Sequence, residues 1–163
     1  MRKLLCVVFA ALLLCGCGAR ETFETLADVY VPEEEIAQKV GVSLPGEAVL
    51  ETLYTDGGRL YLCDGYTVAV QTLPGGDLQR TVKEISGYEK DKIHLVETKQ
   101  DTLTRYHMVW TCAGEGGDSV ARAVIVDDGS YHYAVTVMAA AQNAGTLTDT
   151  MQEILNSVTL RTD

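Results

Sequence analysis

From Val40 onward, apolar and polar residues alternate with a period of two, as they do in strands that bury one face. The alternation is clearest in 66–73, in which the even-numbered residues share one face. Turn sequences such as Asp56-Gly57-Gly58 and Asp128-Gly129 separate neighbouring strands and predict consecutive hairpins. The other predicted strands are 40–44, 48–55, 59–63, 93–99, 103–112, 119–127 and 130–139.

Two segments instead repeat apolar residues every three or four positions, which predicts amphipathic helices. The first runs from Asp77, which can cap its N-terminus, to Ser86, and Gly87 follows in the position that favours glycine. The second covers 148–158, and its apolar stripe consists of Met151, Ile154, Leu155 and Val158.

These elements together predict an α+β domain. Consecutive hairpins form an antiparallel sheet, and amphipathic helices need an apolar sheet face to cover. We therefore expect a central antiparallel sheet of about six to eight strands, flanked by the two helices. Trp110 is in phase with Met108 and Cys112, so it is expected in the core.

The order of elements between about residues 40 and 160 resembles the PsbP-like fold. The resemblance depends on Val42-Ser43-Leu44-Pro45, on the helix after Pro74-Gly75-Gly76, and on a closing helix that runs into Asn156-Ser157-Val158-Thr159-Leu160. It implies an α/β/α sandwich around the antiparallel sheet. Many bacterial members of this group are lipoproteins of unassigned activity, and the group has no shared catalytic residues to carry over.

The first residues carry a targeting signal. Arg2 and Lys3 precede an uninterrupted apolar run, Leu4–Leu14, which is shorter than the ~20 residues that a membrane span needs. The following Leu14-Cys15-Gly16-Cys17 resembles the lipobox of bacterial lipoproteins. That resemblance implies cleavage after Gly16 and attachment of a diacylglyceryl group to the sulfur of Cys17.

This interpretation divides the chain into a signal peptide (1–16), a lipid-anchored tether (17–31) and one domain (32–163). Two alternatives stay open: an ordinary secretory signal, or an anchor helix that is never cleaved. A metal or redox pair at Cys15 and Cys17 is disfavoured, because no His or acidic ligands stand nearby with suitable spacing.

Charge excludes one class of partner. The 163 residues contain 13 Lys+Arg and 23 Asp+Glu, a formal net charge of −10. Removal of residues 1–16 would take away Arg2 and Lys3 and leave −12 on the mature chain. Because binding to a polyanion needs clustered Lys and Arg, we expect no nucleic-acid partner.

Catalytic motifs are missing from the sequence. It has no Gly-x-Ser-x-Gly elbow, no Walker loop, no His-Glu-x-x-His, and no Gly-x-Gly-x-x-Gly that opens a helix after a strand. His107 and His132 both alternate with apolar strand residues and could project from one sheet face as half of a metal site. Without a third ligand we predict neither a metal nor a cofactor.

Tyrosine and cysteine supply the remaining candidates. Eight tyrosines are present, and aromatic-rich surfaces mark binding sites, although Tyr is also favoured in strands. For the two cysteines of the domain, Cys63 and Cys112, we predict separate reduced thiols rather than a disulfide bridge. The tyrosines that form the candidate binding surface are Tyr61, Tyr66, Tyr131 and Tyr133.

The sequence as a whole favours a lipid-anchored binding or assembly module on the extracytoplasmic face of the cell membrane, without catalytic activity. Its partner is an unidentified protein or small molecule. Two alternatives stay open. An envelope-acting enzyme would show a pocket with two or more titratable side chains of perturbed pKa, and a small-ligand or lipid carrier would show a continuous apolar cavity between sheet and helix.

Overall fold

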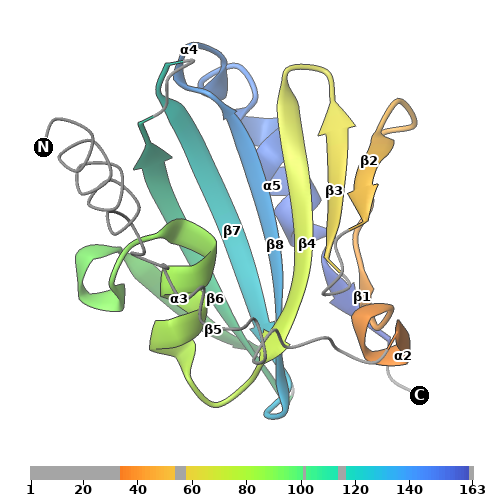
Figure 1. Ribbon diagram of the computed structural model, residues 1–163, viewed down its shortest axis with the longest axis vertical. Coiled ribbons are helices and arrows are strands. Elements are labelled where there is room, and N and C mark those ends of the chain that lie inside the picture. The colour runs from red at the N-terminus through yellow and green to blue at the C-terminus, as the bar shows by residue number, and fades with distance from the viewer. Residues whose placement is uncertain (1–33, 54–57, 101, 114–116, 162–163) are drawn as a thin grey trace, which may run out of the picture.

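A seven-stranded antiparallel sheet forms the centre of the computed structural model, which describes residues 34–53, 58–100, 102–113 and 117–161 (Figure 1). A separate two-stranded sheet pairs β1 (Val40–Gly41) with β9 (Thr159–Leu160). In spatial order, the strands of the large sheet are β2 (Val49–Leu53), β3 (Arg59–Cys63), β4 (Tyr66–Pro74), β8 (Tyr131–Ala140), β7 (Ser119–Asp127), β6 (Leu103–Cys112) and β5 (Leu95–Gln100).

Two meanders build this sheet. Strands β2, β3 and β4 pair consecutively, as do β5, β6, β7 and β8, and each pair is antiparallel. The meanders join where β4 pairs with β8, in a register that sets Val68 opposite Val137. The predicted hairpins are thereby confirmed, together with the α+β class.

Five short helical segments complete the described fold. Helix α3 (Leu78–Ser86) begins and ends as its sequence predicts: the Asp77 side chain accepts from the amide of Arg80 at 3.0 Å, and Gly87 ends the helix with φ 76°. The others are α2 (Glu34–Ala37), the 3₁₀ turn η1 (Lys90–Lys92), α4 (Ala141–Ala144) and α5 (Thr148–Asn156).

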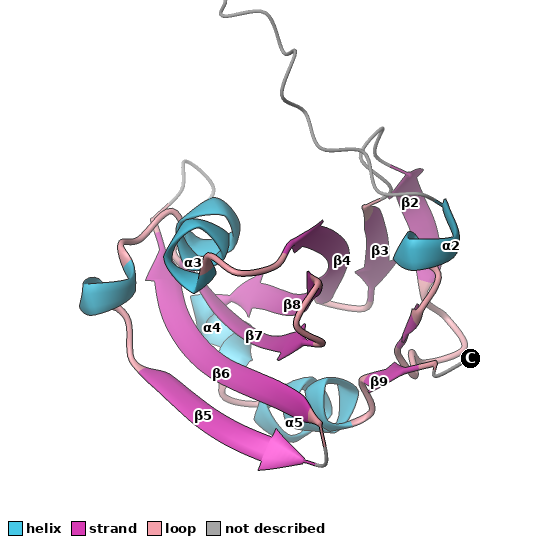
Figure 2. Ribbon diagram, turned by 90° about the horizontal axis from the view of Figure 1, so that it is seen from below, coloured by secondary structure: helices cyan, strands magenta, loops and turns pink. Residues whose placement is uncertain are grey.

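Helices α3 and α5 pack against different faces of the sheet (Figure 2). On the α3 side, Val82 packs in a cluster with Trp110, which is 7% exposed, as predicted. On the α5 side, Met151 and Ile154 pack against the valines of β4, β7 and β8. Because the centres of β7 and β8 are covered on both faces, Val124–Val126 and Tyr133–Val137 are buried without alternation.

The beginning and end of the described chain differ from the sequence expectation. The strand predicted at 40–44 is limited to Val40–Gly41, and its partner β9 was not predicted. The α2 segment is tied to β3 because Arg59 donates to the carbonyls of Ala37 (3.5 Å) and Val40 (3.3 Å). The predicted signal peptide, Cys17 and the tether lie outside the described residues. Within the described chain, no helix has the length and apolar character needed to cross a bilayer.

Candidate functional site

The four candidate tyrosines all lie on the α5 side of the sheet. Tyr66 (7% exposed) and Tyr133 (0%) are part of the buried core, whereas Tyr61 and Tyr131 are half-buried at its margin. The Tyr131 and Tyr133 rings are tilted by 53°, with centroids 6.2 Å apart, and the Tyr133 hydroxyl donates to Asp128 at 3.1 Å. A binding role for the four tyrosines stays a prediction. Of the four, only Tyr61 and Tyr131 are partly exposed.

The two strand histidines do not share a face, which corrects the expectation of half a metal site. His107 lies opposite Val124 in the β6–β7 register, on the α5 side. His132 lies on the α3 side, because its neighbour Tyr133 faces α5 and successive strand residues point to opposite faces. Among the described residues, no cluster of three or more His, Cys, Asp or Glu side chains could hold a metal ion.

His132 instead belongs to a buried polar network. Its Nδ1 lies 2.7 Å from the Thr81 hydroxyl on α3, and its Nε2 lies 3.6 Å from Oδ2 of Asp127. The order hydroxyl–imidazole–carboxylate resembles that of a hydrolase triad. However, Thr81 is 2% exposed and its hydroxyl donates to the Asp77 carbonyl, so a substrate has no route to it. The network links helix to sheet.

Cys63 and Cys112 face opposite sides of the sheet. Cys63 packs on the α5 side and Cys112 on the α3 side, and both are free thiols, as predicted. Burial raises the pKa of the Cys63 thiol, with a smaller opposing effect of a hydrogen bond to Tyr66. Burial likewise raises the pKa of Tyr66 to about 12. Both groups are therefore protonated at neutral pH and unsuited to nucleophilic chemistry.

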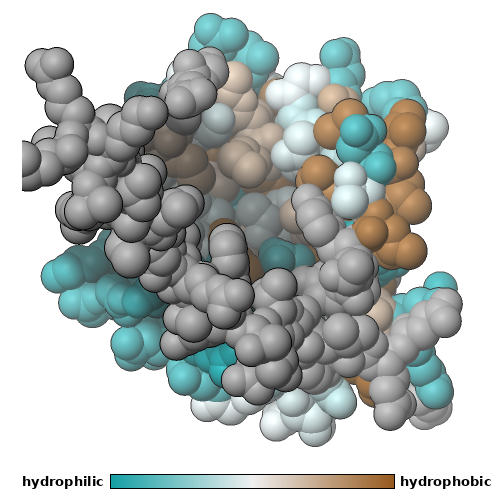
Figure 3. All heavy atoms as spheres, viewed as in Figure 1, coloured by the Kyte–Doolittle hydropathy of each residue, from teal (hydrophilic) through white to brown (hydrophobic). Residues whose placement is uncertain are grey.

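Apolar side chains gather on the outermost strand at one end of the sheet. Figure 3 shows the hydrophobic residues over β2 and β3. We call the exposed large residues here the β2 edge surface: Val49 (61% exposed), Leu50 (50%), Leu53 (67%) and Leu62 (40%).

The β2 edge surface combines apolar side chains with open backbone. Strand β2 is the terminal strand of the sheet, so its outer edge has no strand partner among the described residues. Its register shifts between Leu50 and Thr52, and Glu51 is the one charged residue in its five. Natural proteins usually protect such edges with lysine, proline or a covering segment.

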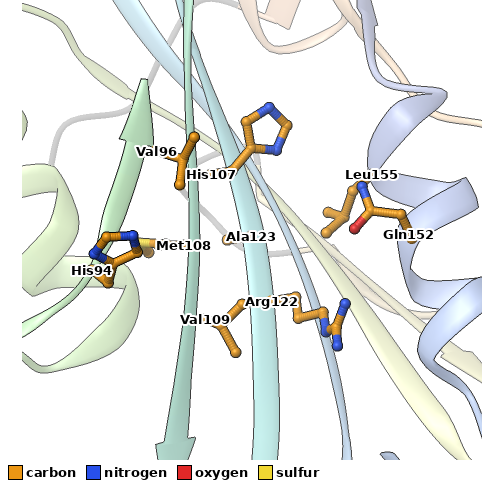
Figure 4. A pocket seen from close by; sticks show the side chains of 9 residues that line it. All are labelled: His94, Val96, His107, Met108, Val109, Arg122, Ala123, Gln152 and Leu155. Atoms are coloured by element: carbon orange, nitrogen blue, oxygen red, sulfur yellow. The ribbon is translucent and has the colours of Figure 1, made fainter. Parts of the chain in front are cut away.

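A second feature lies near the other end of the sheet, between α5 and strands β5 to β7. This α5-side pocket has a volume of about 140 Å³ (Figure 4). It is lined by His94, Val96, His107, Met108, Val109, Arg122, Ala123, Gln152 and Leu155. A more polar depression of about 190 Å³ adjoins it and shares His94 and Val109 with it.

The α5-side pocket is basic in a protein whose overall charge is −10. The Nε of the Arg122 side chain is enclosed and has no hydrogen-bond partner within the described chain. Burial lowers the pKa of His107 from its ordinary value of 6.5, and the charge of Arg105 lowers it further. An enclosed donor without a partner costs about 1–3 kcal/mol.

The chemistry available in this pocket suits binding better than catalysis. None of the nine lining residues supplies a hydroxyl, thiol or carboxylate that could act as nucleophile or acid. His107 could accept a proton, but it has no partner of that kind within the lining set.

Sequence reasoning missed Arg122 and Gln152. One signal for Arg122 was present: it is the charged residue in the otherwise apolar segment 120–126, in phase with Val124 and Val126 on the face that α5 covers. Gln152 had no such signal, because a glutamine on the polar side of an amphipathic helix is ordinary.

Comparison with known proteins shows with which solved structure the chain shares its fold. No family model matches the chain, and no curated protein matches its sequence. A crystal structure from Bacteroides thetaiotaomicron aligns with a TM-score of 0.55 at 12% identity, over 78% of this chain and 47% of that one. The chain therefore spans about half the length of that protein.

Two further structures align at lower scores. The Saccharomyces cerevisiae Ran-binding protein Mog1p has a TM-score of 0.46 at 10% identity, over 75% of this chain and 90% of that one. LpqN, involved in cell envelope biogenesis of Mycobacterium tuberculosis, has a TM-score of 0.44 at 11% identity, over 76% and 83% of the two chains. These comparisons establish that the chain shares a fold with the Bacteroides protein, and they assign no activity to it.

Proposed function

We propose that this protein is a lipid-anchored, extracytoplasmic binding or assembly module without catalytic activity, which docks a protein partner along the β2 edge surface. The observation that carries the proposal is the exposure of Val49, Leu50 and Leu53 on a terminal strand. An exposed apolar strand at an open sheet edge is a surface on which another chain can pair.

An extended segment of a partner protein suits this surface best. The outer edge of β2 offers unpaired backbone N–H and C=O groups, which a partner strand can satisfy by extending the sheet. Side chains on a strand alternate between two faces, so Leu50 and Val49 would contact such a segment from opposite faces of the extended sheet. Backbone pairing would supply affinity, and the apolar side chains would supply selectivity.

The anchor is proposed from the lipobox-like Leu14-Cys15-Gly16-Cys17. Two acyl chains on Cys17 would hold the protein on the membrane, since each buried methylene contributes about 0.8 kcal/mol. The mature charge of −12 would be repelled by anionic lipids, which would keep the domain at the distance that its tether allows. We propose that the domain itself is a PsbP-like α/β/α sandwich.

The alternative of an envelope enzyme is less well supported by the geometry. The α5-side pocket has no nucleophile in its lining, and Thr81 and His132 of the Thr81–His132–Asp127 network are buried. A lipid carrier would need a continuous apolar cavity, whereas the space between α5 and the sheet is filled by Met151, Ile154 and the strand valines.

The anchor is tested in a bacterial host. Expression of the full chain with radiolabelled palmitate should label the protein, and mass spectrometry should find diacylglyceryl on the N-terminal Cys17. The Cys17→Ala protein should be neither labelled nor processed. Normal processing and membrane retention of Cys17→Ala would contradict the anchor.

The docking surface is tested by site-specific photo-crosslinking in intact cells. A photoreactive amino acid in place of Leu53 should give one discrete adduct with a partner protein, and peptide mapping should identify a partner peptide attached at β2. A probe in place of Lys99, on the opposite terminal strand, should give no such adduct. Leu50→Lys should abolish the adduct, whereas Thr98→Lys on β5, the matched control, should preserve it.

Two outcomes would reject a protein partner at this edge. One is an adduct between two copies of this chain, and the other is an internal crosslink from Leu53 to residues 17–33.

A further inference from the structure

We propose that the α5-side pocket binds a small organic monocarboxylate, whose carboxylate pairs with Arg122 and whose short apolar body lies against the surrounding strand residues. The pocket adjoins β5, at the opposite end of the sheet from the β2 edge surface. The inference is therefore independent of the proposed protein docking, and either can fail alone.

The charge around the pocket selects an anion. Arg122 lines it, Arg105 lies on the same face of β6, and no carboxylate is among the nine lining residues. His107 also lines the pocket, but its pKa lies below 6.5, so at pH 7 it contributes a ring nitrogen rather than a charge. The Arg122 guanidinium, whose Nε has no partner, can bind a carboxylate through two parallel N–H···O bonds.

A second polar side chain, that of Gln152, lines the pocket together with Arg122. In Figure 4 the Arg122 side chain extends from β7 toward α5, and the Gln152 side chain extends from α5 toward the strands. Gln152 Nε2 donates one hydrogen to Asn156 at 2.9 Å, which leaves the other for a ligand oxygen. A carboxylate between the two would receive donors from both sides.

Apolar side chains surround these donors and limit the ligand. Val96, Val109, Ala123 and Leu155 line the pocket beside Arg122. An apolar cavity of ~150 Å³ accommodates benzene, so the ~140 Å³ here fits an acid of about four to six carbons. Inorganic phosphate, as a dianion, would make no apolar contact with these walls and would place two negative charges beside one guanidinium. A branched short-chain carboxylate satisfies both the walls and the charge.

The probe is 3-methylbutanoate, titrated into the full-length protein in detergent micelles at pH 7 and followed by saturation-transfer NMR. Empty micelles serve as the blank for partitioning of the acid. We expect saturable binding with a Kd on the order of 1 mM, as suits a ligand of about seven heavy atoms. The uncharged isostere 3-methylbutanamide should bind at least tenfold more weakly, because it lacks the charge that Arg122 recognises.

Two variants test the named residue. Arg122→Gln should weaken binding of 3-methylbutanoate at least tenfold, whereas Arg80→Gln, the same change on the exposed side of α3, should not alter it. Val109 is 52% exposed and lies opposite Arg122 in the β6–β7 register. Val109→Glu should therefore place a carboxylate beside Arg122 and abolish binding, and this variant keeps the test decisive if Arg122→Gln does not fold.

Three results would each overturn the proposal. The first is the absence of saturable binding up to about 20 mM, which is beyond the range expected for a ligand of this size. The second is equal binding of the acid and its amide, or binding that survives both Arg122→Gln and Val109→Glu. The third is equal affinity for inorganic phosphate, which would show a general anion site without a role for the apolar walls.

Discussion

The imidazole Nδ1 of His132 lies 2.7 Å from the hydroxyl oxygen of Thr81, and this contact links strand β8 to helix α3 inside the core. The two residues are 1% and 2% exposed. The Thr81 hydroxyl also lies 3.3 Å from the Asp77 carbonyl oxygen, and the direction of the Thr81–His132 hydrogen bond follows the imidazole tautomer. Because His132 is buried away from water, its Nδ1 depends on the Thr81 hydroxyl for a partner.

Thr81→Val should lower the free energy of unfolding by about 1–3 kcal/mol, since it leaves the buried imidazole without its partner while it preserves side-chain volume. Urea denaturation followed by Trp110 fluorescence measures the change. Thr98→Val, on the exposed face of β5, is the control and should change stability by less than about 0.5 kcal/mol. A Thr81→Val protein as stable as the parent would show that the contact contributes nothing.

Gly75→Ala should destabilise the fold by roughly 1–3 kcal/mol, because the new methyl group overpacks a backbone contact. A Cβ at Gly75 would lie 2.7 Å from the carbonyl carbon of Ser130, and the Gly75 amide donates to the oxygen of that same carbonyl at 2.9 Å. At Gly46 a Cβ would meet nothing within 4 Å.

Gly46→Ala should therefore be neutral or stabilising, by at most about 1 kcal/mol. Thermal unfolding of both proteins in the same buffer makes the comparison. Equal melting temperatures for Gly75→Ala and Gly46→Ala would contradict the steric argument.

His107 should make stability depend on pH. Its folded-state pKa lies below the ordinary 6.5, first because of burial and second because of Arg105, so protonation favours the unfolded chain. The stabilising contribution of neutral His107 is fully present above pH 6.5 and is lost as the pH falls through the folded-state pKa.

Replacement of this histidine should remove its part of the pH dependence. His107→Gln should lose less stability than the parent when both are acidified from pH 7 to pH 5. Urea denaturation at several pH values gives the two curves. Parallel curves over the whole range would show that His107 does not titrate differently in the two states.

The processed chain should contain two titratable thiols when it is unfolded without reductant. Cys63 and Cys112 face opposite sides of the sheet, and a bridge would need both side chains on one side. In the folded protein the Cys63 thiol should react slowly at neutral pH, because burial raises its pKa. A thiol-specific reagent with and without denaturant measures both, and zero thiols in the unfolded, unreduced protein would reveal a disulfide.

Much of the local structure could be predicted because the relevant forces act between near neighbours. Asp77 caps α3 through an amide three residues away, and Gly87 ends it with a backbone angle that other residues avoid. The hairpin turn at Asp128-Gly129 joins strands that are adjacent in sequence. The even-numbered residues of β4, from Tyr66 to Thr72, are buried as their alternation predicts.

The short strands β1 and β9 could not be predicted from the sequence, because each forms only by pairing with a distant segment of the chain. Strand β1 has two residues and exists through its pairing with β9, more than a hundred residues later in the chain. Such a strand has too few residues for a recognisable period.

The sequence by itself determined the α+β class, the hairpins, both amphipathic helices and the burial of Trp110, because periodicity and turn chemistry are local properties of the chain. The tertiary structure decided that β4 pairs with β8, and this pairing joins the two meanders into one sheet. It also decided that His107 and His132 face opposite sides, and that Arg122 and Gln152 line the same α5-side pocket. Alternation along a strand gives relative orientation only, and the packing of strands and helices from distant parts of the chain converts it into a particular face and a particular neighbour.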